Sequence, residues 1–349
     1  MNSVDHKPIT IVGAGLAGLA LGIGLRQQRV PVMLYEAGAL PRHRVCGEFI
    51  CGRGTTVLKE LGVANHLDEA VYHQKVEWYH KGKPLFRHSL PTPATGISRY
   101  LLDQRLAETF CALGGQLQCQ QRFRVESEGL ADSGMVLCNG RQRAAGPPRW
   151  LGLKVHLKTA RAATAGLKVY LGDGCYVGLS GIEQGKVNLC GLFRIRPSIG
   201  GGKIERLCAY LRAAGLNTLS ELIQSSEVDA DSFCAVTALD FSMPKQSHHQ
   251  LRLGDQFGMI APFTGNGMSI ALESAQIALE PLLAYAQGDC DWAEAIKIVQ
   301  TKLSRRFKTR IRIARCLQPL LLCRSGQLSL GRLGQMQLLP INPLYQLTH

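Results

Sequence analysis

The sequence predicts an α/β protein in which a Rossmann-like dinucleotide-binding domain is interleaved with a β-sheet-rich domain and followed by a helical C-terminal region. Three observations support this prediction. A glycine-rich turn near the N-terminus stands between a β-rich apolar run and a helical run. Strand patterns dominate the middle of the chain, and a second glycine-rich turn then leads into a long helical pattern. We therefore expect the chain to leave the first domain, build the second, and return.

The N-terminal unit has the order strand, helix, strand. Residues 8–13, PITIVG, are short, apolar and β-rich, as buried strands are. Residues 16–28, LAGLALGIGLRQQ, have helical character, and residues 30–36, VPVMLYE, predict a second strand. Residues 97–115, ISRYLLDQRLAETFCALGG, predict a further helix that stops at its glycine pair.

Strands and hairpins are predicted over the middle segments 75–90, 150–157, 167–195 and 231–241, with GDG and EQG as turns. A helical pattern returns with residues 265–287. The predicted discontinuous nucleotide-binding domain covers 1–72, 96–150 and 246–290, the substrate domain covers 73–95 and 151–245, and the helical C-terminal region covers 291–349.

The composition indicates a basic protein with a large core. The chain has 349 residues, 46% of them hydrophobic, and its 40 Lys and Arg residues exceed its 26 acids to give a net charge of +14. Such a surface favours phosphates, carboxylates, nucleic acid or an anionic membrane. The charge is not concentrated in one module and no nucleic-acid motif occurs, so we expect no nucleic-acid partner.

The twelve cysteines stand singly, with no CxxC pair and no zinc spacing. Many lie among apolar residues and are typical of reduced core cysteines in an intracellular protein. The N-terminus lacks the pattern of a secretory leader, and no apolar run reaches the length of a membrane span. We therefore expect a cytoplasmic protein.

The segment GAGLAG places Gly13, Gly15 and Gly18 at dinucleotide-binding spacing. Gly13 permits the tight turn, Gly15 lets the backbone approach a pyrophosphate, and Gly18 lets the helix pack on the sheet. The helix N-terminus then offers free N–H groups to the phosphates. Glu36 ends the second strand, where an acid accepts hydrogen bonds from an adenosine ribose. The alternative is a glycine-rich packing motif without a ligand.

The second glycine-rich motif is LRLGDQFGMIAPFTGNGMSIALESA, residues 251–275. It resembles the second FAD fingerprint of the p-hydroxybenzoate hydroxylase and geranylgeranyl reductase superfamily. The resemblance spans residue 8 to about residue 290 and implies non-covalent FAD. It implies that Asp255 binds the ribityl chain. Gly265, Gly267 and Met268 would lie at the pyrimidine end of the isoalloxazine, where the helix dipole stabilises negative charge.

The same resemblance assigns three further cofactor contacts. Arg99, at the start of the helical segment 97–115, would reach the FAD phosphates or the flavin edge, and its alternative role is a surface salt bridge. Arg44 would lie near the phosphates or a reductant, as would Arg42. Val125 falls where the superfamily lays backbone against adenine.

The segment VCGEFICGRG, residues 45–54, falls where the superfamily places a loop bordering the isoalloxazine. Cys46 and Gly47 match the Cys-Gly pair of geranylgeranyl reductase relatives, although Glu48 replaces a common glycine. We predict no metal site, because only His43 and Glu48 stand nearby as ligands. A Cys46–Cys51 redox pair stays open, as does a chemical role for Cys46.

Two expected features of relatives are absent. Hydroxylases of the superfamily carry an Asp-Gly motif linked to FAD and NAD(P)H handling, and the nearest match here is Asn139-Gly140-Arg141. The tryptophan-rich motif of halogenase relatives is missing as well. The first departure weakens the prediction that NAD(P)H is the electron donor.

Residues 301–322 form a basic amphipathic pattern whose apolar residues recur at helical spacing. The apolar set is Leu303, Phe307, Ile311 and Ala314, and the basic set is Lys302, Arg305, Arg306, Arg312 and Arg315. Such a helix can lie peripherally on an anionic membrane. It can equally pack on its own domain and expose only its basic face.

These features together predict an FAD-dependent oxidoreductase. The first expectation is an NAD(P)H-supported monooxygenase that hydroxylates an aromatic or polyketide-like small molecule. The alternative enzyme is a geranylgeranyl-reductase-like reductase of prenyl or quinone double bonds, which Cys46-Gly47 and the basic, apolar tail favour. A non-enzymatic flavin-binding partner protein is the third reading.

Overall fold

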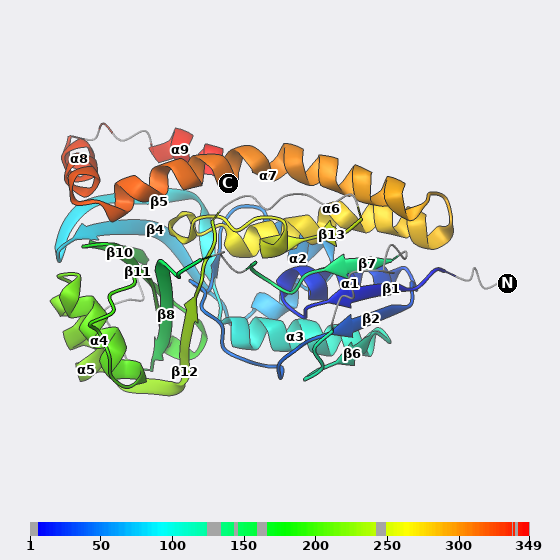
Figure 1. Cartoon of the computed structure of the whole chain (residues 1–349), viewed down its shortest axis with the longest axis horizontal. Helices are drawn as coiled ribbons and strands as arrows, with labels where there is room; N and C mark the ends of the chain where they lie inside the picture. Colours follow the sequence, from blue (N-terminus) through cyan, green and yellow to red (C-terminus); the bar gives the residue numbers. More distant parts are fainter. Residues whose placement is uncertain are drawn as a thin grey trace.

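A computed structural model describes residues 6–123, 134–142, 146–158, 166–241, 249–336, 338 and 341–348. The molecule is elongated, with a parallel sheet at one end and a large curled sheet at the other (Figure 1). Helix α7 (Trp292–Leu322) runs along the length of both and contacts strands of each sheet. The predicted α/β class is confirmed.

The smaller sheet has five described strands, all parallel to their neighbours, in the order β13-β7-β1-β2-β6. The strands are Leu251–Arg252 (β13), Met135–Leu137 (β7), Ile9–Val12 (β1), Val32–Tyr35 (β2) and Gln116–Gln118 (β6). Helices α1 (Leu16–Gln27), α3 (Arg99–Ala112) and α6 (Gly267–Gln287) pack together beside it. Helix α1 is apolar on almost every side because it lies buried between α3 and α6.

The larger sheet has eight described strands in the order β12-β8-β11-β10-β9-β4-β5-β3, antiparallel except where β4 meets β9. The strands are Phe49–Ile50 (β3), Val71–His80 (β4), Lys83–Gly96 (β5), Trp150–Leu157 (β8), Leu167–Gly172 (β9), Cys175–Gly181 (β10), Val187–Arg194 (β11) and Val228–Thr237 (β12).

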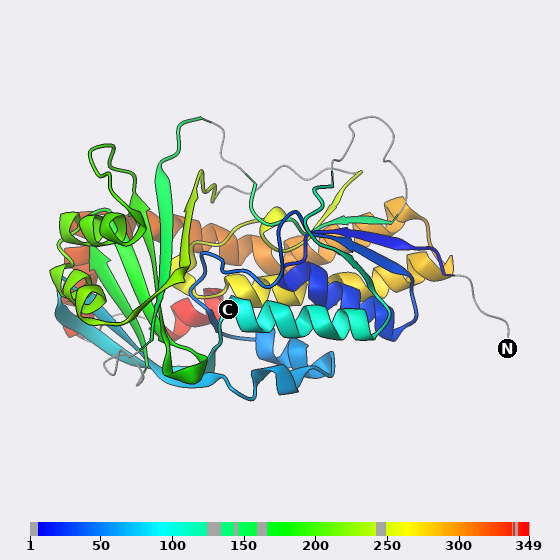
Figure 2. The ribbon, with the colours of Figure 1, turned by 90° about the horizontal axis from the view of Figure 1, so that it is seen from below.

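The two faces of the larger sheet differ in chemistry because side chains alternate along each strand. On β8, Leu151, Leu153 and Val155 pack in the core under α4 (Lys203–Ala213) and α5 (Asn217–Ser225). Figure 2 shows these two helices on the outer face of the sheet, away from the parallel sheet. The other face of β8 carries Lys154 and His156, which contact Glu48. This face of the sheet is therefore turned toward the loop that holds Glu48.

The remaining helices are α2 (Gly54–Glu60), α8 (Arg324–Gln335) and α9 (Ile341–Thr348), with short 3-10 turns at Ala64–Leu67, Glu183–Gly185, Gly254–Gln256 and Pro262–Thr264. The predicted apolar stripe of α7, from Leu303 to Ala314, is buried. Arg306 and Arg310 of α7 pair with Glu273 of α6. Among the described residues, no helix combines the length and apolar character needed to cross a bilayer.

The sequence anticipated most of these elements and missed some. The predicted strands and helices of the N-terminal unit are confirmed, as is the return to helix at α6. Helices α2, α4 and α5 were not anticipated. The division into domains stays a prediction, and β3 pairs with β5 of the larger sheet although it falls within predicted segment 1–72.

Candidate active site

The first glycine turn leads from β1 into α1 with φ of +111° at Gly13. A Cβ at Gly13 would overlap the carbonyl oxygen of Cys138, and one at Gly18 would overlap the carbonyl oxygen of Gly13. A Cβ at Gly15 would meet only a guanidinium nitrogen of Arg99, at 3.8 Å. Gly13 and Gly18 thus serve packing, whereas Gly15 leaves the uncapped start of α1 open.

Glu36 lies buried beside this turn and accepts three hydrogen bonds from the chain. Its Oε2 accepts from the backbone N–H of Ala14 at 3.1 Å. Its Oε1 accepts from the N–H of Gly38 at 3.0 Å and from Nη2 of Arg42 at 2.8 Å. Since a carboxylate has about four acceptor positions, room for a further donor remains.

Two arginines and one aspartate extend this charged region along α3. Arg99 donates from Nε and Nη2 to the two carboxylate oxygens of Asp103, both at 2.8 Å. Arg44 donates from Nε to Asp103 at 3.1 Å and lies 3.5 Å from Glu36. Asp103 is fully buried. We call Glu36, Arg42, Arg44, Arg99 and Asp103 the arginine cluster. The sequence analysis missed Asp103, although its spacing of four residues from Arg99 on a helix was an available signal.

The arginine side chains of this cluster keep their positive charge. Burial alone would lower the pKa of Arg99, but the charge and hydrogen bonds of Asp103 outweigh it and raise that pKa. Burial lowers the pKa of Arg44, with Asp103 partly offsetting it. Guanidinium groups in proteins stay charged, so the cluster presents permanent positive charge beside the start of α1.

The second glycine turn joins β13 to α6. Burial raises the pKa of Asp255, which the positive charges of Arg99 and Arg141 partly offset. At Gly265, with φ of +70°, a Cβ would overlap the ring of Phe49. Helix α6 begins at Gly267 without a side-chain cap, and a Cβ there would meet nothing within 4 Å. The side chain of Met268 is buried, so only its backbone N–H is available for a ligand. Val125 lies outside the described residues.

The loop of residues 43–48 packs against the polar face of the larger sheet. Asn188 Nδ2 donates to the carbonyl oxygens of Cys46 and Gly47 at 3.0 and 2.9 Å, and Ser180 Oγ donates to Gly47 at 2.7 Å. Burial raises the pKa of the Cys46 thiol, and Arg99 only partly offsets it. Cys46 and Cys51 are both free thiols. Cys46 is therefore held as a neutral thiol.

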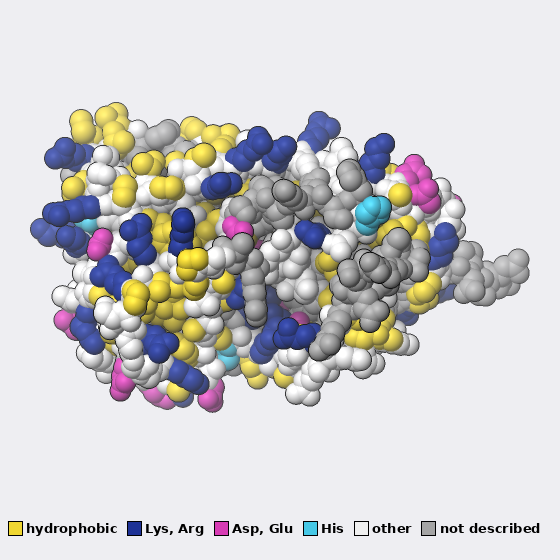
Figure 3. All heavy atoms as spheres, viewed as in Figure 1, with side chains coloured by type: hydrophobic (Ala, Val, Ile, Leu, Met, Phe, Trp, Pro, Cys, Tyr) yellow, Lys and Arg dark blue, Asp and Glu magenta, His cyan; other side chains and the backbone are white. Residues whose placement is uncertain are grey.

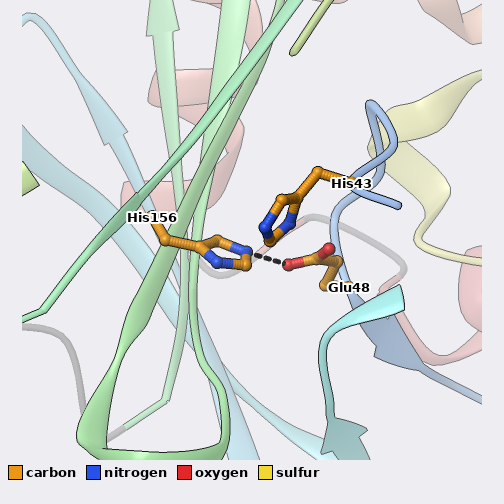
Figure 4. Close-up of side chains that lie close together, drawn as sticks. All are labelled: His43, Glu48 and His156. Atoms are coloured by element: carbon orange, nitrogen blue, oxygen red, sulfur yellow. Dashed lines mark hydrogen bonds and ion pairs between the residues drawn. The ribbon is translucent and has the colours of Figure 1, made fainter. Parts of the chain in front are cut away.

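Glu48 is the centre of a second buried ionic group, which the sequence analysis did not assemble (Figure 4). Its Oε2 lies 2.5 Å from Nε2 of His156, and its Oε1 lies 3.2 Å from Nζ of Lys154. Lys154 Nζ also lies 3.2 Å from Nδ1 of His43. The backbone N–H of Arg99 donates to Glu48 Oε1 at 3.1 Å. We call His43, Glu48, Lys154 and His156 the glutamate–histidine cluster.

The pKa values of Glu48 and His43 are shifted by burial and neighbouring charge. Burial would raise the pKa of Glu48, but the hydrogen bond from His156 and the charge of Lys154 outweigh it and lower that pKa. Burial, and next the charge of Lys154, lower the pKa of His43 to about 4. At neutral pH His43 is therefore uncharged, and its Nδ1 accepts from the Lys154 ammonium.

His43, Glu48 and His156 have the composition of a metal-ligand set, and their donor atoms lie within 4.8 Å of one another. The Lys154 ammonium, however, already contacts both Glu48 and His43. A divalent cation in the same space would be repelled by this charge. We therefore assign no metal to the cluster.

An apolar wall continues the same face of the larger sheet toward α7. Its members pack as one core cluster: Tyr176, Leu192, Phe241, Leu321 and Leu322, with Trp78, Trp150 and Phe263 at its edge. Phe263, from the second glycine turn, meets Tyr176 edge to face with ring centroids 6.1 Å apart. The sheet thus presents a charged region and an apolar region side by side next to the second glycine turn.

Comparison with known proteins places this architecture. No family model matches the chain. PqsL of Pseudomonas aeruginosa, in complex with 2-aminobenzoylacetate, superposes with a TM-score of 0.75 at 15% identity over 93% of this chain and 99% of that one. The chain has the fold of the FAD-dependent monooxygenases. HpxO of Klebsiella pneumoniae, complexed with FAD and uric acid, shares this monooxygenase fold with a TM-score of 0.73, 15% identity, and coverage of 98% of this chain and 96% of that one.

Sequence similarity to curated proteins is partial. A menaquinone reductase of Mycolicibacterium smegmatis is 28% identical over 143 residues, which are 37% of this chain and 35% of the relative. The matches to curated menaquinone reductases span less than half of those relatives' length. The monooxygenase fold therefore rests on structure, and the reductase likeness on part of the sequence.

Proposed function

We propose that this chain is an FAD-dependent oxidoreductase, and specifically an NAD(P)H-supported monooxygenase that hydroxylates an aromatic or polyketide-like small molecule. One observation carries the proposal. Two uncapped helix starts, at α1 and α6, are each kept open by a glycine, and Arg99 lies beside the first of them. Neither Gly15 nor Gly267 has a side chain, so the space in front of each helix start is free for a dinucleotide. The residues present therefore fit FAD.

The chain's residues divide the non-covalent binding of FAD among them. The turn of Gly13, Gly15 and Gly18 would receive the pyrophosphate, with Arg44 and Arg99 supplying positive charge. Glu36 would use its remaining acceptor position for the adenosine ribose.

The second glycine turn would hold the other half of the cofactor. Asp255 would bind the ribityl chain, and Gly265 with the N–H groups of Gly267 and Met268 would face the pyrimidine end. Val125 stays a predicted adenine contact.

FAD, when bound, would supply the redox chemistry, with a nicotinamide as the source of hydride. The chain supplies orientation, a dry site and charge. The apolar wall around Tyr176 and Phe263 supplies the aromatic surface against which an apolar substrate would pack. Asn188 and Ser180 hold the 43–48 loop against the larger sheet. The loop forms the boundary between the charged region and the apolar region of that sheet.

Two measurements test this function. Purified protein should show the visible spectrum of oxidised flavin, and denaturation should release the FAD intact. Adding NADH or NADPH with aromatic candidates should raise oxygen consumption above the rate without a candidate. A colourless protein that binds no added FAD would refute the proposal, and flavin binding without turnover would favour the partner-protein reading.

The second candidate is a reductase of prenyl or quinone double bonds. The partial identity to menaquinone reductases and the Cys46-Gly47 pair favour it. In this reaction the neutral thiol of Cys46 could deliver a proton after hydride transfer. Anaerobic turnover of a menaquinone analogue with NAD(P)H, without oxygen consumption, would select this candidate over the first.

We also propose a peripheral contact with anionic membranes. The apolar stripe of α7 is buried and is not available for it, but the C-terminal part of α7 and the residues that follow it expose apolar side chains among arginines. These are Leu320, Leu328, Leu333, Met336, Leu338 and Leu347, with Arg312, Arg315, Arg324 and Arg332. Figure 3 shows hydrophobic and basic side chains together over the end where α8 lies. Apolar contact combined with positive charge suits an anionic lipid surface.

Vesicle flotation tests this contact. The protein should float with phosphatidylglycerol vesicles and remain behind with phosphatidylcholine vesicles. The pair Leu328→Glu and Met336→Glu should abolish flotation, whereas Tyr72→Glu, at an exposed apolar residue on β4, should not. Flotation that is unchanged by the pair would exclude this surface.

A further inference from the structure

We propose that the glutamate–histidine cluster is a path for protons between solvent and the buried site beside the 43–48 loop. This proposal rests on the proposed function only for the identity of the molecule that the site binds. The path itself is a property of four side chains, which can be tested with or without cofactor.

Geometry provides a continuous chain of polar contacts. It runs from His43 Nδ1 to Lys154 Nζ, from Lys154 to Glu48, and from Glu48 to His156 Nε2. The outer end is accessible, because His43 is only partly buried and stacks on Tyr100, which is 38% exposed. The inner end is closed, because Lys154, Glu48 and His156 are at most 1% exposed.

The inner end also lies at the proposed site. Asn188, the cross-strand partner of His156, holds the carbonyl oxygens of Cys46 and Gly47. The backbone N–H of Glu48 donates to Cys46 Sγ at 3.4 Å. His156 is therefore next to the 43–48 loop, and Phe49, which follows that loop, packs on Gly265 of the second glycine turn.

The residue types distinguish a path from a fixed clamp. Lysine, carboxylate and imidazole can each lose and regain a proton, whereas a guanidinium cannot. A clamp that served only to hold the 43–48 loop would be at least as stable with apolar residues of similar size, because burying charges is costly. Glu48 is moreover held with φ of +56°, which is unfavourable for a residue with a side chain.

Other charged and titratable groups surround the path. Asp229 of β12 is the cross-strand partner of His156 and raises the pKa of His43 slightly. Arg99 approaches Glu48 from α3. Three cysteine thiols, whose pKa values burial raises, lie near enough to Glu48 for its charge to raise those pKa values further. They are Cys46 of the loop, Cys190 of β11 and Cys234 of β12. None of the three cysteines interrupts the chain of contacts from His43 through Lys154 and Glu48 to His156.

The proton balance closes over one passage. A bound molecule gives a proton to Nδ1 of His156, which releases its Nε2 proton to Glu48. Lys154 passes a proton to Nδ1 of His43 and receives the one held by Glu48. His43 gives its Nε2 proton to water. Every group regains its charge and both imidazoles end as the other tautomer, so a passage in the opposite direction restores the starting state.

Solvent exchange of imidazole N–H groups, measured by NMR on ¹⁵N-histidine protein, tests the path. The N–H of buried His156 should exchange much faster than that of His73. His73 is the internal control, because it is equally buried but bonds only the carbonyl oxygen of Gly181. His43→Phe keeps a ring against Tyr100 and removes the acceptor for Lys154. It should slow His156 exchange by about tenfold or more, or ~1.4 kcal/mol of barrier.

Two further variants keep the test decisive. Glu48→Gln retains size and hydrogen bonding without the charge and should slow exchange similarly. Lys158→Met, at the exposed pair with Glu227 just beyond β8, should change nothing. Exchange at His156 as slow as at His73, or unaffected by His43→Phe and Glu48→Gln, overturns the path. Failure to bind FAD with fast exchange intact would instead overturn the proposed function alone.

Discussion

The two buried ionic clusters meet at one short stretch, Arg42-His43-Arg44, yet they are built from different chemistry. Arg42 and Arg44 turn to the arginine cluster, and His43 between them turns to the glutamate–histidine cluster. The first cluster relies on guanidinium groups that cannot release protons, and the second uses lysine, imidazole and carboxylate, which can.

The two sets of side chains suit different chemical tasks. Permanent positive charge beside an uncapped helix start suits phosphates, whose own charge does not need to change during a reaction. Exchangeable protons suit a place where bonds to hydrogen are made and broken. Glu48 joins the two clusters, since it also accepts from the backbone N–H of Arg99.

The largest expected effect comes from breaking the arginine cluster. Asp103→Ala would leave Arg44 and Arg99 without their shared, fully buried partner. The free energy of unfolding should fall by about 3–5 kcal/mol, as for other buried pairs that lose one member. Urea unfolding measures it. Asp173→Ala, which breaks an exposed pair with Arg196, should cost no more than about 1 kcal/mol. Equal losses in both variants would contradict the comparison.

The electrostatic effect of the arginine cluster on the second glycine turn can be tested at Asp255, because burial raises the pKa of that residue and the charge of Arg99 partly offsets the rise. Asp255→Ala should remove an acceptor for a ribityl hydroxyl, worth about 1.5–3 kcal/mol of FAD binding. Equilibrium titration with FAD would measure this. Asp240→Ala, just after β12 of the larger sheet and outside the turn, serves as the control. Unchanged affinity in Asp255→Ala would remove this residue from the site.

A pH titration sharpens the contrast between fixed and exchangeable charge. The pKa of His43 is lowered from 6.5 to about 4, so the unfolded chain binds this proton more readily between those values. The free energy of unfolding should therefore fall as the pH drops through this window. Because His43 is half-exposed, the loss is on the order of 1 kcal/mol. His43→Asn should flatten the profile measured by urea unfolding, and an identical profile would contradict the assignment.

The smallest expected effect concerns Cys46, which feels both Arg99 and Glu48. In a hydroxylase Cys46→Ala should leave turnover at saturating substrate almost unchanged. In a double-bond reductase Cys46→Ala should lose more than about tenfold, roughly 1.4 kcal/mol of barrier, while Cys46→Ser should retain activity. FAD content must be equal in all three proteins for the comparison to hold.

Features that depend on residues close together in the chain could be predicted from the sequence alone. Gly13 and Gly18 are required where a β-strand turns tightly into a helix, and that need is visible in the chain as spacing. The apolar stripe from Leu303 to Ala314 predicted a helix, because periodicity follows from backbone geometry. The pairing of Arg99 with Asp103 could also have been predicted, since residues four apart meet on a helix.

Contacts between residues far apart in the chain became visible only in the tertiary structure. Glu48 and His156 are far apart in the chain, and no local rule relates them; they meet because β8 turns its polar face toward the 43–48 loop. The same packing buried the stripe of α7 against the core instead of leaving it for a membrane. Spacing encodes contacts within a helix or a turn, whereas contacts between a loop and a distant strand depend on how whole sheets pack.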